Sequence, residues 1–240
     1  MTDNALKAAG IAGMVGAVLW SIGDVLIVGG TANPADYPLL SNTYASRISF
    51  GALPLMLGLP EQRLALGALL NNLAIPLYLA GSWHLYRGAR PAGRALSFAI
   101  LVLLMCGNAW SPLGHAGFYY IGRVYQTMLA VPPEAHEALL ALGDEFNRML
   151  LIAWLLPVVT LGCGLLLLCA AILTGRSAYP RWSALVINPF VPLFIAAAGS
   201  ILPSPLGPWF HAAVLNVAFL LIYTASTAGS MAEKILSIRS

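Results

Sequence analysis

The sequence contains very little charge. Asp, Glu, Lys and Arg make up 9% of its 240 residues, against roughly 25% in an ordinary soluble domain. Hydrophobic residues make up 59% of the chain, which is more apolar surface than a soluble fold of this length could bury. The composition therefore excludes a soluble domain and predicts an all-α polytopic membrane protein.

The sequence also lacks the patterns of several functional classes. Its net charge is only +3 and its basic residues form no patch, so no nucleic-acid partner is expected. No two histidines stand at H-x-x-x-H or H-x-x-H spacing, and we therefore predict no metal ligand set and no cofactor. The three cysteines, Cys106, Cys163 and Cys169, lie inside apolar runs without C-x-x-C spacing. They are predicted to be reduced packing residues.

The chain does contain long apolar runs, each long enough to cross a bilayer as a helix. They predict a bundle of six transmembrane helices within a single domain, at about 6–30, 64–87, 94–122, 148–174, 183–202 and 209–232.

The placement of Lys and Arg predicts the orientation of this bundle. If the N-terminus is cytoplasmic, eight basic residues lie inside and four outside, so the positive-inside rule favours N-in and C-in. The inner set is Lys7, Arg87, Arg90, Arg94, Arg176, Arg181, Lys234 and Arg239, and the outer set is Arg47, Arg63, Arg123 and Arg148.

Two outer connections are longer than the short turns that join neighbouring helices. The first, residues 31–63, contains the apolar stretch SFGALPLMLGLP at 49–60, which is too short to cross and is predicted to be re-entrant, interfacial or lid-like. The second contains VPPEAHEALLALGDEFNR, which predicts an amphipathic helix at 132–147 that starts at the proline pair. This helix could run into the fourth span or break at Gly143.

Asp24 is the one carboxylate inside the first apolar run, GIAGMVGAVLWSIGDVLIVGG. An acid within a membrane helix costs free energy unless it is paired, so it marks a functional site by default. Helical spacing places Asp24 on one face with Trp20, Gly16 and Gly13, and glycines on that face let a neighbouring helix approach closely. The alternative is a carboxylate whose hydrogen bonds serve only helix packing.

Other polar residues fall in the outer halves of four of the five remaining spans, and this clustering predicts a polar pocket that opens outward. We expect His115, Asp144 and Glu145 to join Asp24 as candidate catalytic groups. The candidate substrate-binding residues are Trp20, Asn72, Asn108, Trp110, Tyr119, Arg148, His211 and Asn216.

Two of these assignments have structural alternatives. Pro112 lacks a backbone N–H and predicts a break in the third span just before His115; His115 could then simply bond a neighbouring carbonyl. Arg148 follows Asp144 by four residues, so an interfacial ion pair explains that group as well as the binding of an anionic head group does.

Three stretches, GIAGMVGAVLWSIGDVLI, GHAGFYYIG and YPRWSALVINP, resemble an uncharacterised bacterial six-helix membrane family of unknown function. That resemblance implies location in the bacterial inner membrane and no particular activity. In architecture the chain is similar to the emopamil-binding isomerases and the membrane-bound terpene cyclases, which protonate double bonds with intramembrane acids. None of their motifs aligns here, so no residue role is transferred.

The sequence thus predicts an intramembrane enzyme, isomerase- or cyclase-like, acting on a membrane lipid or isoprenoid-like small molecule. An Asp24 kept protonated by apolar surroundings would donate a proton, and His115 or a carboxylate of the 144–145 pair would accept one. A lipid-binding or transport protein without chemistry is the main alternative. An assembly subunit is a third, since small-residue faces also suit contacts with a partner.

Overall fold

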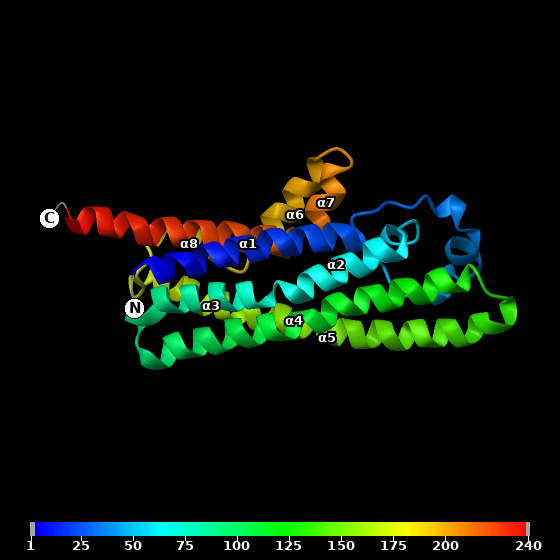
Figure 1. The fold of residues 1–240 in the computed structure, drawn as a ribbon, viewed down its shortest axis with the longest axis horizontal. Coiled ribbons are helices and arrows are strands. Elements are labelled where there is room, and N and C mark those ends of the chain that lie inside the picture. The colour runs from blue at the N-terminus through cyan, green and yellow to red at the C-terminus, as the bar shows by residue number, and fades with distance from the viewer. Residues whose placement is uncertain (1–2, 239–240) are drawn as a thin grey trace.

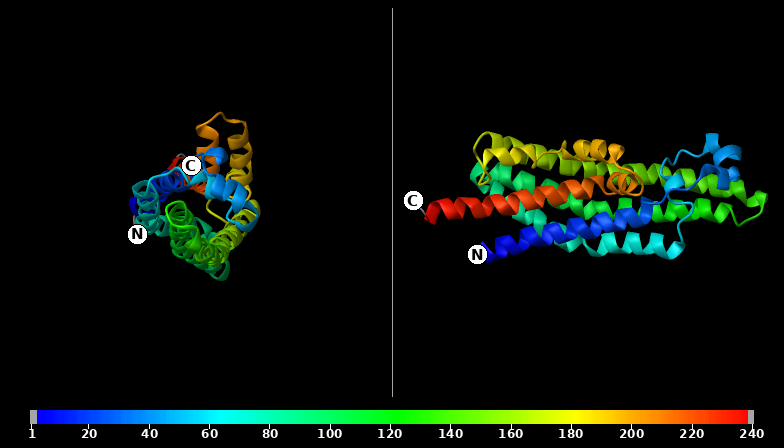
Figure 2. Two further views of the ribbon diagram at one scale, coloured as in Figure 1. Left: turned by 90° about the vertical axis from the view of Figure 1, so that its right-hand side faces the viewer. Right: turned by 90° about the horizontal axis from the view of Figure 1, so that it is seen from above.

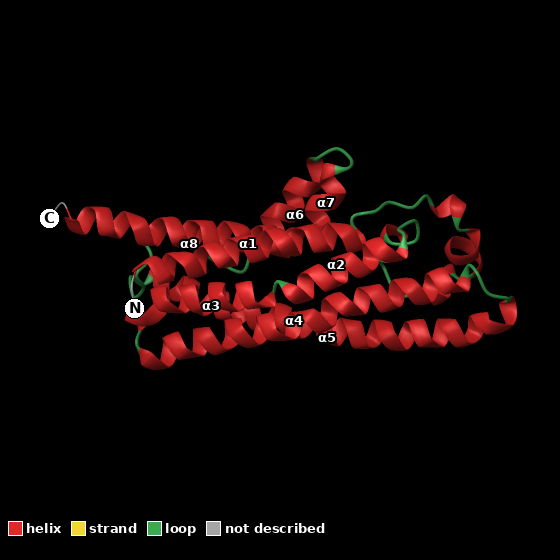
Figure 3. Ribbon diagram, in the orientation of Figure 1, coloured by secondary structure: helices red, strands yellow, loops and turns green. Residues whose placement is uncertain are grey.

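The computed structural model describes residues 3–238, and the side chains of residues 4–228; Arg239 lies outside the described residues. Every regular element in that range is helical (Figure 3). The helices are α1 (Asp3–Val28), α2 (Glu61–Leu73), α3 (Ile75–Ala89), α4 (Arg94–Met128), α5 (His136–Leu173), α6 (Val191–Ile201), α7 (Leu206–Ala212) and α8 (Val214–Ile238).

The long helices run side by side in one elongated bundle (Figure 1). Here α1 packs against α2, α3 and α8, while α4 packs along α5. The start of α1 and the end of α8 lie at one end of the bundle, here called the terminal end. The opposite end, the cap end, carries residues 29–60, and α6 and α7 project sideways between the two ends (Figures 1 and 2).

Four helical stretches of the described chain are long and apolar enough to cross a membrane: Asn4–Val28, Glu61–Ala92, Arg94–Met128 and Pro133–Leu173. The pair α7 and α8, bent by 76°, gives a fifth if it counts as one span. The predicted span at 183–202 is not a continuous helix. Only α6 within it is α-helical, and its 11 residues extend about 17 Å at 1.5 Å per residue.

A proline divides the second predicted span, whereas a proline in the third leaves the helix continuous. The second span is divided at Ala74 into α2 and α3, because Pro76 has no N–H to continue the helical hydrogen bonds. The predicted break at Pro112 in the third span is absent, since α4 passes through Pro112 without interruption. Close packing explains this difference, because the glycines on either side, Gly107 and Gly114, lie directly against α5 and neighbouring protein supports the helix there.

Small residues along α1 bring its neighbours close, as the sequence predicted. A Cβ placed on Gly13 would lie 2.9 Å from the Tyr223 ring and 3.0 Å from the Gly81 Cα atom. One on Gly16 would lie 3.1 Å from the Leu77 Cβ atom. Asp24 lies on the same buried face, so the prediction that it points into the bundle is confirmed.

The apolar interior forms two main clusters along the bundle. The terminal-end cluster surrounds the fully buried side chains Tyr78, Leu85, Leu168 and Tyr223. The cap-end cluster is built from Ile27, Phe50, Met56, Leu64, Ile121, Tyr125 and Met128.

Residues 29–60, here called the cap-end segment, pack against the helices of the bundle. Phe50, Leu53 and Met56 are buried, and the Gln126 side chain donates to the Met56 and Leu59 carbonyls at 3.0 and 2.9 Å.

The predicted helix at 132–147 does not break at Gly143. A single 3₁₀ turn at Pro133–Ala135 leads directly into α5, which then runs on to Leu173.

Candidate functional site

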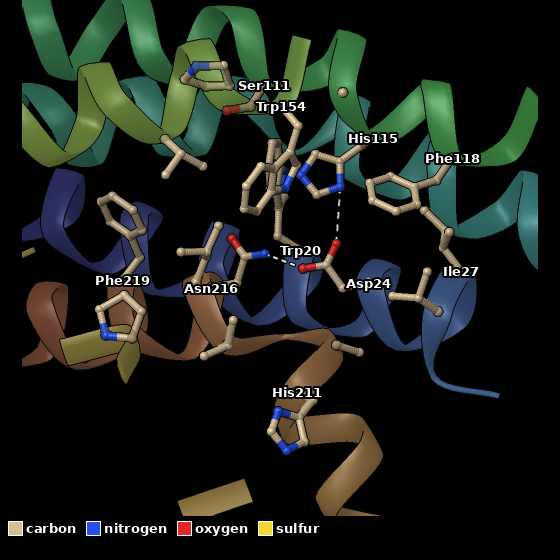
Figure 4. Close-up of a pocket in the computed structure, with 18 of the residues that line it drawn as sticks. Trp20, Asp24, Ile27, Ser111, His115, Phe118, Trp154, His211, Asn216 and Phe219 are labelled. Carbon is tan, nitrogen blue, oxygen red and sulfur yellow. Dashed lines mark hydrogen bonds and ion pairs between the residues drawn. The ribbon is translucent and has the colours of Figure 1, made fainter. Parts of the chain in front are cut away.

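A cavity of about 640 Å³ lies beside Asp24, within the roughly 300–1,000 Å³ of typical small-molecule sites. Figure 4 shows α4 and α5 on one side of it and α1 and α8 on the other. Residues of α6 and α7 also line it, and Ala52 and Leu55 of the cap-end segment contribute to its wall. Its lining is mostly apolar, so the few polar groups in it determine its chemistry.

The Asp24 carboxylate has three polar neighbours from three other helices. Asn71 of α2 donates from Nδ2 to Oδ1 at 3.1 Å, and Asn216 of α8 donates from its own Nδ2 to Oδ2. His115 of α4 places Nδ1 3.1 Å from Oδ1 (Figure 4). Asp24 is therefore paired, as a carboxylate in an apolar bundle must be.

Tyr78 fixes the orientation of the Asn216 amide. The Tyr78 hydroxyl donates to Asn216 Oδ1, which leaves the Asn216 NH₂ group to face Asp24. Oδ2 of Asp24 therefore accepts a hydrogen bond from Asn216, while Oδ1 accepts one from Asn71 and faces His115.

The Asp24–His115 contact brings a carboxylate and an imidazole together. Nδ1 of His115 lies 3.1 Å from Oδ1 of Asp24 and 3.0 Å from Nδ2 of Asn71. An acid and an imidazole at this separation are the pair of groups that general acid–base chemistry uses.

The pair remains accessible from the cavity, and aromatic rings flank it. The side chains of His115 and Asp24 are 16% and 10% exposed, and both line the cavity. The Trp20 ring packs edge-on against the His115 ring with centroids 4.2 Å apart, and against Tyr78 at 5.1 Å. The buried Trp20 indole N–H has no hydrogen-bond partner among the described residues.

Half of the sequence-predicted site residues come together here. Asp24, His115, Trp20, Asn108, His211 and Asn216 all line the cavity. His211 lies on α7, where its Nε2 is 3.3 Å from the Ser200 hydroxyl. Asn108 donates to the Ser82 hydroxyl at 2.8 Å, so its amide nitrogen is already engaged.

The other predicted residues lie away from the cavity. Asp144 accepts from the Ser49 hydroxyl at 3.3 Å near the cap end, and Glu145 and Arg148 are exposed on α5. Asn72 donates back to the Ala68 carbonyl within its own helix. Trp110 is 44% exposed on the outside of the bundle, and the Tyr119 hydroxyl donates to Glu61 at 3.3 Å.

Two causes account for several of these placements: the length of α5 and the helical phase of α2. Helix α5 begins at His136, twelve residues before the predicted fourth span, so the acids near the predicted start of that span lie on the part of α5 that borders the cap-end segment. On α2 the sequence-based prediction selected Asn72, whereas Asn71 reaches Asp24. The apolar positions Leu64, Gly67 and Ala68 share a buried face with Asn71, and this spacing was the available signal.

Fold and site together define a class: a helical integral membrane protein with a carboxylate–imidazole pair in an internal, mostly apolar cavity. The chain belongs to a family of unknown function (DUF6796), whose family model matches residues 1–232. No curated protein and no solved structure matches the chain.

Proposed function

We propose that the protein is an intramembrane enzyme that performs acid–base chemistry on an amphipathic lipid or isoprenoid-like molecule, as isomerases and cyclases do. The observation that carries this proposal is the Asp24–His115 contact, 3.1 Å long. It lies in the wall of a cavity large enough for a small-molecule ligand. Double-bond migration adds a proton at one carbon and removes one from another, so it needs an acid and a base without any net oxidation.

His115 is the group that exchanges the proton with the ligand in this scheme. Its Nδ1 contacts Asp24, so its other ring nitrogen is the one left for the ligand. Asp24 holds the tautomer and balances the imidazolium charge when His115 is protonated. The Trp20 ring adjoins His115, and its π face would stabilise positive charge that develops on the ligand.

The terminal-end cluster favours an enzyme over a carrier. A carrier must expose its site to both membrane surfaces in turn. Tyr78 lines the cavity and belongs to this cluster, and Leu85, Leu168 and Tyr223 of the same cluster are fully buried. A path toward the terminal end would require this cluster to come apart.

The finer topology is also a proposal. We propose that both termini face the cytoplasm of a bacterial inner membrane. Residues 177–201 would form a discontinuous fifth pass and α8 the sixth. Support comes from the common terminal end of α1 and α8 and from the basic residues Arg87, Arg90 and Arg94 at that end, as the positive-inside rule expects. In a chain without native cysteines, a membrane-impermeant maleimide applied to intact cells should label Glu134→Cys and not Arg90→Cys. Labelling of Arg90→Cys alone would reverse the orientation.

The catalytic proposal is tested by lipid analysis of cells that express the protein. Extracts from cells with the wild-type chain, with Asp24→Asn and with His115→Gln are compared by mass spectrometry with an empty-vector control. The wild type should convert at least one lipid species, and both variants should abolish that conversion. Asp144→Asn is the matched control, because it removes an acid that lies outside the cavity, and conversion should persist.

A binding function without chemistry is the second candidate, and the predominantly apolar lining of the cavity favours it. Conversion by Asp24→Asn at the wild-type rate would end the acid–base role. A lipid that copurifies with the wild type unaltered, in cells whose lipid composition does not change, would identify a binding protein.

A further inference from the structure

The charge of the cavity wall restricts the ligand. Among the described residues that line the cavity there is one carboxylate, Asp24, and two histidines, His115 and His211; none is Lys or Arg. A phosphate or carboxylate on a ligand would therefore find no permanent cation in this wall. It would instead lie in apolar surroundings near another anion, which disfavours both charges.

Of the four arginines in the outer set, Arg148 is exposed on α5 and does not line the cavity, and the other three have partners elsewhere. Arg63 donates to the Leu26 and Val25 carbonyls at 3.1 and 3.0 Å, where α1 ends. Arg123 pairs with Glu61 at 3.1 Å, and Arg47 pairs with Glu137 at 2.7 Å. To serve an anionic ligand, each of these would have to leave contacts that it already makes.

A cationic ligand is also poorly served, because it would have to compete for Asp24 with three polar partners that are already in place. Oδ1 accepts from Asn71 and contacts His115, while Oδ2 accepts from Asn216. A hydroxyl fits the groups that remain. It can donate to the ring nitrogen of His115 that faces away from Asp24, and it needs no charged partner in the cavity wall.

We propose that the cavity selects amphipathic lipids whose polar end is an uncharged hydroxyl and discriminates against the same chain with a phosphate or an amine. This inference rests on the proposed function in taking the same cavity as its site, and it names the ligand class of that cavity.

Gly162 offers a way to close the cavity without disturbing the bundle. It lines the cavity from α5, and a Cβ added there meets no atom within 4 Å. A phenylalanine at this position should therefore occupy cavity space rather than displace a neighbouring helix. Gly162→Ala is the matched control, since a single methyl group leaves most of the cavity open.

The experiment titrates the purified full-length protein with three probes of one chain length and measures bound complexes by native mass spectrometry. The probes are farnesol, farnesyl monophosphate and farnesylamine. Farnesol should bind to the wild type at one site, at least tenfold more tightly than either charged probe. Gly162→Phe should weaken farnesol binding at least tenfold, whereas Gly162→Ala should retain it.

His211→Arg provides a gain-of-function test that does not depend on lost binding. It adds a cation to the cavity wall at an exposed position, so it should tighten farnesyl monophosphate binding at least tenfold. Equal wild-type affinity for farnesol and its monophosphate would overturn the inference. It would also be overturned if Gly162→Phe left farnesol binding unchanged, or if His211→Arg left monophosphate binding unchanged.

The two proposals can fail separately. Loss of the charge preference, with Asp24-dependent lipid conversion intact, would overturn only the ligand class. Preserved hydroxyl selection in a protein that converts no lipid would overturn only the chemistry.

Discussion

The hydrogen bond from Tyr78 to Asn216 holds the amide group that donates to Asp24, and a double-mutant cycle can measure the strength of that hydrogen bond. Tyr78→Phe removes the hydroxyl and leaves Asn216 Oδ1 without its donor. Asn216→Leu keeps a similar volume but leaves both the buried Tyr78 hydroxyl and Asp24 short of one partner. Each buried group left unsatisfied costs about 1–3 kcal/mol, so Asn216→Leu should destabilise the protein more than Tyr78→Phe.

The cycle isolates the pair itself. In membrane bundles, hydrogen bonds between helices contribute about 0.6 kcal/mol on average and at most about 1.7, so we expect a coupling energy of about 1 kcal/mol between the two positions. The free energy of unfolding is measured by titrating detergent-solubilised protein with SDS. Tyr120→Phe combined with Asn216→Leu is the control, because Tyr120 is 56% exposed and should be additive. If Tyr78→Phe and Asn216→Leu also add to within about 0.3 kcal/mol, the Tyr78–Asn216 hydrogen bond does not support the site and the reasoning is wrong.

Two further predictions concern stability. Gly81→Ala should destabilise the bundle, because its Cβ would lie 2.6 Å from the Tyr223 ring. Gly162→Ala on α5 should stabilise the bundle by about 0.5–1 kcal/mol through helix propensity. A stabilising Gly81→Ala or a destabilising Gly162→Ala in SDS unfolding would contradict the packing argument. Gln126→Ala removes both hydrogen bonds that the side chain donates to the cap-end segment. Protease should therefore cleave that segment faster, while the overall helicity stays unchanged. An unchanged cleavage rate would show that the apolar cluster alone keeps the segment in place.

Much of the site was predictable because polar residues are rare in this chain. A carboxylate in an apolar helix attracts attention by itself, and the helical spacing of Gly13, Gly16 and Trp20 correctly gave the buried face of Asp24. His115 and Asn216 followed from the same reasoning, since each is an isolated polar residue within an apolar run. At these positions the free-energy cost of an unpaired polar group in hydrocarbon is enough to identify the residue from its sequence context.

The remaining site residues depended on contacts that hydropathy does not encode. Asn71 and Asn72 are equal in composition, and only the register of α2 against α1 separates them. Residues 183–202 are apolar enough for a span, but Pro189 has no N–H to continue a helix, and α6 begins only at Val191, with Pro192 in its first turn. Arg148 was grouped with the cavity residues because it stands at the predicted start of the fourth span; in the structure it is exposed and lies twelve residues into α5, which begins at His136.

The polar contacts around Asp24 lie at the boundary between the two apolar clusters. Apolar side chains in a lipid environment tolerate sliding, because one methyl group replaces another at little cost. A slide of α1 by one turn, about 5.4 Å, would take Asp24 away from partners on α2, α4 and α8 at once. The polar layer thus specifies the alignment of four helices, as a single buried asparagine does in a coiled coil.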